Sequence, residues 1–136
     1  DLSITGPGFF DAVEIQSDGA NVQVLASGNI TIQDGPAAPG SSATIINGRV
    51  QSTGAAAIVL IRAEDELFFG ADGDVILTVG GSITLTADSD LDSNGTGGGV
   101  TMVDGTVINA GSGTIAVNAD EDVTLTGLIT TRGHNP

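Results

Sequence analysis

Apolar residues open a new alternating segment about every eight residues between Val59 and Leu125. Each segment begins with roughly three to five residues of apolar and polar alternation, and it ends on Gly, Asp, Asn or Ser. Alternation is typical of half-buried strands, and the closing residues favour tight turns. Three segments make a period of about 24 residues. The segments begin at Val59, Leu67, Val75, Ile83, Leu91, Val100, Val107, Ile115 and Val123.

This period predicts an all-β chain folded as a parallel β-helix, or β-solenoid, with about three short strands per coil of ~24 residues. The alternative is an antiparallel β-sandwich, because strands every eight to ten residues also suit that fold. A sandwich gives no reason for a 24-residue register to persist, so the solenoid is the preferred interpretation.

Stacking three segments per coil predicts which residues share a face of the solenoid. Val100 comes one residue late, which we interpret as a slip within Ser93–Gly99. Residues two places further along point the same way, so Asn109 is expected in the interior or at a corner, bonded to a neighbouring turn. The predicted faces hold Val59, Ile83 and Val107; Leu67, Leu91 and Ile115; and Val75, Val100 and Val123.

A longer self-similarity divides the chain into two internal repeats, about 22–74 and 75–131, within one solenoid domain spanning 1–136. Val22 and Val75 are 53 residues apart, and Val59 and Ile115 are 56 apart. The segment 34–42 contains two prolines and is expected to leave the coil as a loop. The first residue is Asp and not Met, so we expect a processed or excised piece of a longer protein.

The amino-acid composition argues against several classes of function. Seventeen acidic residues stand against three Arg and no Lys, for a net charge of −14, which opposes binding to nucleic acid or to anionic lipid. The longest apolar run, Ala55–Ile61, is seven residues, too short for membrane insertion. The absence of Cys excludes a disulfide framework and a thiolate metal site.

We predict that the chain is not an enzyme. Polysaccharide lyases and hydrolases built on parallel β-helices place carboxylates beside an Arg, Lys or His base and use aromatic platforms for sugar rings. Here the single His is His134, near the end of the chain, the three Arg are scattered, and Tyr and Trp are absent.

The acidic residues cluster in predicted turns. Three Asp and one Asn alternate before Gly95, at positions 88, 90, 92 and 94, like the first half of a calcium-binding loop without its closing Glu. Stacked coils are expected to bring the turns of Glu64, Asp88 and Asp120 together, where a cation would relieve repulsion. Two interpretations remain: a Ca²⁺ site, or solvated turn residues that keep the protein soluble. The candidate ligands are Asp72, Asp74, Asp88, Asp90, Asp92, Asn94, Asp120 and Asp122.

The stretches VQVLASGNITIQD, GDVILTVGGSITLTAD and GTVINAGSGTIAVNADEDVTLTGLITT resemble the strand repeats of filamentous-haemagglutinin-type adhesins and autotransporter passenger domains. The resemblance covers roughly residues 22–131 and implies an extracellular, bacterial cell-surface protein with a structural or adhesive role. Solenoid ends expose unpaired ladder groups and core, so we expect self-association end to end or with neighbouring repeats of a longer chain. A fibre or layer subunit and a host or surface glycan or protein partner fit the resemblance; the alternative is a calcium-stabilised sandwich module of an adhesin.

Overall fold

The structure is a computed structural model of the 136-residue chain, and it describes residues 2–5, 14–16, 23–33, 43–88 and 98–131. The described residues form fifteen strands in three five-stranded sheets. Sheet A holds β1 (Leu2–Thr5), β4 (Ile30–Gln33), β7 (Ala57–Arg62), β10 (Gly81–Thr86) and β13 (Thr114–Asn118). Sheet B holds β2 (Glu14–Gln16), β5 (Ala43–Asn47), β8 (Glu66–Phe69), β11 (Val100–Met102) and β14 (Val123–Leu125). Sheet C holds β3 (Gln23–Ala26), β6 (Arg49–Ser52), β9 (Val75–Leu77), β12 (Val107–Asn109) and β15 (Leu128–Thr130).

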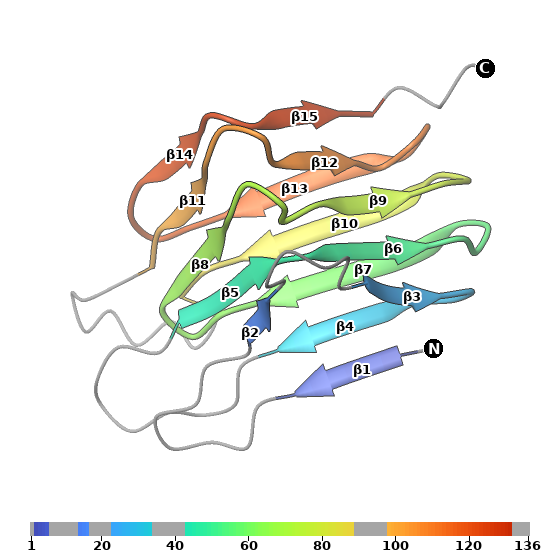
Figure 1. Ribbon diagram of the computed structural model, residues 1–136, viewed down its shortest axis with the longest axis horizontal. Helices are drawn as coiled ribbons and strands as arrows, with labels where there is room; N and C mark the ends of the chain where they lie inside the picture. Colours follow the sequence, from blue (N-terminus) through green and yellow to red (C-terminus); the bar gives the residue numbers. More distant parts are fainter. Residues whose placement is uncertain (1, 6–13, 17–22, 34–42, 89–97, 132–136) are drawn as a thin grey trace.

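Every strand pair among the described residues is parallel, and each strand pairs with the strand three places along the chain. The chain therefore visits sheets A, B and C in turn and climbs by one strand at each coil (Figure 1). This is a parallel β-solenoid with three strands per coil, as predicted. The antiparallel β-sandwich alternative is wrong, because a sandwich of that kind requires antiparallel neighbours.

The 24-residue period holds for only one coil of sheet A. Val59 pairs with Ile83, 24 residues on, but Ile83 pairs with Ile115, 32 residues on. Beyond Ile83 the predicted sharing of faces is therefore wrong, except that Val100 and Val123 pair as predicted. The observed columns are Val59, Ile83 and Ile115 in sheet A; Leu67, Val100 and Val123 in sheet B; and Val75 and Ile108 in sheet C.

The extra length enters where the chain passes from sheet A to sheet B. In the coil of β7–β9, Val59 and Leu67 are eight residues apart, whereas their pairing partners Ile83 and Val100 are 17 apart. The one-residue slip that we expected at 93–99 is therefore wrong, because nine additional residues separate β10 from β11. Leu91 and most of Ser93–Gly99 lie outside the described residues, as does the predicted loop at 34–42, which joins the same two sheets between β4 and β5.

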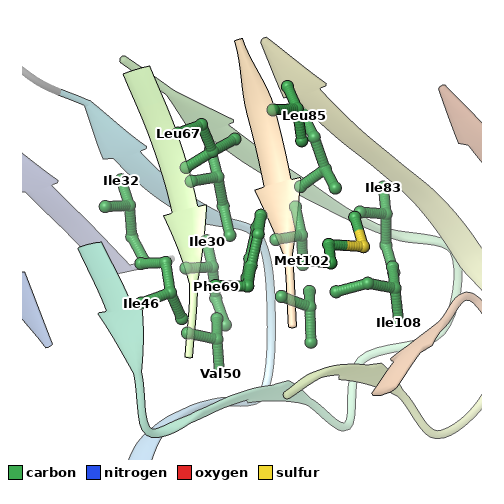
Figure 2. Close-up of a cluster of buried hydrophobic side chains, with 14 of the residues drawn as sticks. Ile30, Ile32, Ile46, Val50, Leu67, Phe69, Ile83, Leu85, Met102 and Ile108 are labelled. Carbon is green, nitrogen blue, oxygen red and sulfur yellow. The ribbon is translucent and has the colours of Figure 1, made fainter. Parts of the chain in front are cut away.

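The core is a continuous apolar column inside the three sheets. Strand residues alternate between full burial and partial exposure, as in β7, where Ala57, Val59 and Ile61 point inward. Each inward residue packs on its pairing partners in the coils above and below, so the side chains form stacked rows (Figure 2). The largest fully buried side chains are Phe69, Ile30, Ile32, Ile46, Ile61, Leu67, Leu77, Ile83, Leu85, Met102, Ile108 and Val50.

Small residues line the start of sheet A, where the coils approach closely. Gly81 pairs with Ala57, and a Cβ built on Gly81 would overlap the Ala57 carbonyl oxygen. The same holds one coil further, where a Cβ on Gly113 would overlap the Gly81 carbonyl oxygen. Since the obstructing atoms belong to the backbone, a side chain here forces the neighbouring strand to move.

We predict that Gly81→Ala lowers the free energy of unfolding by about 1–3 kcal/mol, because the new methyl group overpacks the ladder. Urea denaturation monitored by circular dichroism measures this. The control is Gly99→Ala, whose nearest new neighbour, the Asp122 carbonyl oxygen, would lie 3.3 Å from the added Cβ. We expect a smaller loss for the control, and equal losses would contradict the explanation.

Candidate functional site

Acidic residues from three coils meet along the edge between sheets A and B. We call this edge the acidic corner; its described members are Glu64, Asp65, Asp88, Asp120, Glu121 and Asp122. The coils are joined here by backbone hydrogen bonds. The Asp88 N–H donates to the Asp65 carbonyl oxygen at 3.0 Å, and the Glu121 N–H donates to the Gly98 carbonyl oxygen at 3.2 Å. The predicted proximity of these turns is confirmed.

Burial divides the acidic corner into two parts. Glu64, Asp65 and Asp88 are buried, with 6–8% of their surface exposed, and each takes part in a polar or electrostatic interaction. Asp88 also has a positive φ of 51°, a conformation that Asp tolerates better than most residues. In contrast, the three acids between β13 and β14 are exposed. The acidic corner therefore contains both buried carboxylates and exposed carboxylates that face solvent.

Gly98 lies between the buried and the exposed acids. A Cβ on Gly98 would be 3.3 Å from the Cβ of Asp88, 3.5 Å from the Cβ of Asp120 and 3.6 Å from the Cγ of Glu121. Its φ of +88° also favours glycine. The absence of a side chain at this position lets the acids of successive coils approach each other, which strengthens their mutual repulsion.

The candidate ligands Asp72 and Asp74 lie at a different edge, between sheets B and C. Asp74 connects three coils. Its Oδ1 accepts a hydrogen bond from the Val107 N–H at 3.0 Å, and its Oδ2 is 3.5 Å from an Arg49 guanidinium nitrogen. Its backbone carbonyl accepts from the Val50 N–H at 2.7 Å. These contacts give Asp74 a structural role, which the sequence pattern did not indicate.

The structure separates the predicted calcium ligands. Asp88, Asp120 and Asp122 lie at the acidic corner, Asp72 and Asp74 lie at the other edge, and Asp90, Asp92 and Asn94 fall outside the described residues. In the part of the chain that the structure describes, no group of three or more His, Asp or Glu side chains is arranged to hold a metal ion. Calcium binding by this set stays a prediction.

Hydroxyl side chains at inward positions form a second set of polar contacts between coils. Thr106 is 1% exposed, and its Oγ1 donates to the Gly70 carbonyl oxygen at 2.9 Å. Ser52 donates to the Gly28 carbonyl oxygen at 2.6 Å, and Thr44 donates to the Arg62 carbonyl oxygen at 3.3 Å. Sequence reasoning missed them, although a Ser or Thr in phase with apolar neighbours, as in Val50-Gln-Ser52, is the signal that indicates such a position.

Asn109 is not an interior residue. It is half-buried beside the inward Ile108, and its Oδ1 accepts a hydrogen bond from the Gly111 N–H in its own turn at 2.8 Å. The interior position is wrong because the phase of β12 is shifted by one residue: Ile108, and not Val107, occupies the core column next to Val75. The corner position that we also expected fits, because Asn109 ends β12 and bonds to the adjacent turn.

Comparisons of the chain with protein families, with curated proteins and with solved structures found no match. The resemblance to surface adhesins is therefore supported at the level of the solenoid fold alone. Among the described residues there is no helix long and apolar enough to cross a membrane.

We predict that Asp74→Ala lowers the free energy of unfolding by about 1–3 kcal/mol, because the Val107 N–H loses its acceptor in a part-buried position. Chemical denaturation measures the change. The control Arg49→Met removes only the ion pair, whose Arg side chain is 44% exposed, and should cost less than about 1 kcal/mol. If the two variants lose the same stability, the ion pair and not the hydrogen bond is the important contact.

We predict that Asp120→Asn raises the midpoint of thermal unfolding by about 1–3 °C at low ionic strength, because it weakens repulsion across Gly98, and that salt reduces the gain. Asp104→Asn, at an exposed acid on the other edge, removes the same charge and should have a smaller effect. If Asp120 ligates calcium, Asp120→Asn will instead lower the midpoint in CaCl₂, while in EDTA it will still raise it.

Proposed function

We propose that the chain is a structural module of an extracellular, bacterial cell-surface protein, with no catalytic role. The observation that carries the proposal is that buried polar side chains form hydrogen bonds between coils. The buried hydroxyls of Thr44, Ser52 and Thr106 each donate to a backbone carbonyl of the same or a neighbouring coil, and Asp74 bridges three coils. These contacts hold the stack together.

Two features of the described residues support a scaffold over a binding or catalytic centre. The core is apolar and continuous from β4 to β12, so the interior is filled by side chains. Of the two described Arg, Arg49 pairs with Asp74, and Arg62 lies on the outer face of sheet A in register with Thr86.

The surface location is supported by composition and by the adhesin resemblance. A chain with a net charge of −14 and no Lys is highly soluble and repels nucleic acid. A ladder closed into a solenoid needs no disulfide for its stability, which agrees with the absence of Cys in a protein exposed outside the cell. In this role the coils space, support or present neighbouring parts of a longer surface protein.

The location is tested on intact cells of the source organism with an antibody raised against the folded chain. We expect labelling without permeabilisation and loss of the signal after brief treatment of whole cells with protease. An abundant cytoplasmic protein, probed in parallel, is the control for cell integrity. Labelling that requires permeabilisation would contradict the proposal.

A further inference from the structure

The charged residues of the described chain occupy one side of the solenoid. Every described Asp and Glu lies in sheet B or at one of the two edges that sheet B shares with sheets A and C. The two described Arg lie near the same edges, since Arg49 begins β6 and Arg62 ends β7. Outside the acidic corner, the described acids are Glu14, Glu66, Asp72, Asp74 and Asp104. The third edge, between sheets C and A, carries no charged side chain in the described part of the chain.

We call this third edge the neutral edge. Its turns contain only Gly, Ala, Ser, Thr, Asn and Val, and they lie one above another on the right of Figure 1. Backbone hydrogen bonds join successive turns: the Thr53 N–H donates to the Ala26 carbonyl oxygen at 3.0 Å, and the Thr78 N–H donates to the Ser52 carbonyl oxygen at 3.1 Å. The neutral edge is thus a regular stack. Its turns, all of them described, are 27–29, 53–56, 78–80 and 110–113.

Large apolar side chains are exposed along the neutral edge. Val79, in the third turn, is 57% exposed, and Ile58, directly after the second turn, is 43% exposed. Leu25, just before the first turn, is 58% exposed, and the turn residues Ala55 and Ala56 are exposed as well. The other exposed large apolar residues of the described chain lie in β14 and β15. Apolar surface gathered on three successive coils, away from the charged groups, is typical of an interaction surface.

We propose that two copies of the chain pack side by side through their neutral edges and form a closed dimer. Each copy contributes the same edge, so the contact is isologous and does not extend into a filament. The spacing of the turns identifies a second copy as the partner. Stacked strands recur about every 4.8 Å, so the turns of one copy fit between the turns of the other along several coils, which an unrelated globular surface does not offer. The inference rests on the proposed structural role only for its biological use.

The distribution of charge favours this contact over any other between copies. Sheet B is the side of the solenoid opposite the neutral edge, and packed sheets lie about 10 Å apart. The acids of two copies joined at their neutral edges are therefore roughly 20 Å apart, about two Debye lengths at 0.1 M salt. Contact through sheet B or its edges would instead bring two acidic surfaces together, where they repel.

The strength of the contact is tested by sedimentation velocity of the purified 136-residue chain, at concentrations up to about 1 mM in about 0.1 M NaCl. We expect the mass to approach that of a dimer and to stop there. Ala55→Asp should weaken the dimer at least about tenfold, because it places two like charges in the contact. Val79→Ser, which removes apolar surface and adds no charge, should weaken it at least about threefold.

Ala71→Asp is the matched control. Ala71 is also an exposed alanine in a turn, but at the edge between sheets B and C. The variant adds the same charge far from the contact and should dimerise like the unmodified chain. Equal weakening by Ala55→Asp and Ala71→Asp would overturn the proposal. Growth beyond a dimer would also overturn it, because it would mean that another surface carries the association. A melting curve of each variant verifies folding.

The geometry of the dimer is tested with one spin label per copy, which is possible because the chain contains no Cys. Thr114→Cys places the label beside the neutral edge, at the start of β13, and Thr124→Cys places it on sheet B, in β14 of the same coil. Both threonines are exposed. We expect the shorter distance between the two labels of a dimer at position 114.

A shorter distance between labels at position 124 would overturn the proposal, and so would a monomer at every concentration. Surface labelling of cells does not depend on any of these outcomes. Failure of the dimer is therefore distinguishable from failure of the proposed function.

Discussion

The parallel hydrogen-bond ladder between successive coils is the interaction on which the rest of this structure depends. Parallel strands cannot be joined by a hairpin, so the chain completes a full coil before it reaches the strand that pairs with the first one. Once the ladder is in register, every inward side chain is stacked on an inward side chain of the next coil, and this stacking forms the core. The glycines at the start of sheet A show how strict this spacing is, since even a methyl group on Gly81 meets the Ala57 carbonyl oxygen.

Ladder register also explains what could be predicted from the sequence. Alternation and turn residues were enough to identify short strands, three to a coil, because these depend on local patterns. The residues that stack on one another in a column could not be identified in this way, because they depend on the length of chain between strands. The pattern treats Ile83, Leu91 and Val100 as equally good strand starts, but the ladder pairs Leu67 with Val100 across nine additional residues. At β12, Val107 and Ile108 are both apolar, and only the pairing of Ile108 with Val75 decides which one faces inward.

The polar residues follow the same logic. Clusters of acids could be located from the sequence, and their proximity at the acidic corner follows from the stacking of coils. Their distribution over two different edges could not be predicted. Asp74 and Asp88 are 14 residues apart, and β9 of sheet C and β10 of sheet A lie between them, so they occupy different edges. The role of Asp74 depends on Arg49 and Val107, which are 25 and 33 residues away. Contacts of this kind leave no local signal.

A solenoid has no internal reason to stop, because each coil that it adds creates a new edge identical in kind to the one it covers. Each coil is therefore stabilised mainly by the coils on either side of it, through the hydrogen-bond ladder and the stacked core. Charge opposes this packing where acids of successive coils meet. The apolar columns continue to Leu125, whereas Asp120, Glu121 and Asp122 beside it are three exposed acids in succession, and salt screens the repulsion among them. The stability of the last described coil depends on the balance of these two forces.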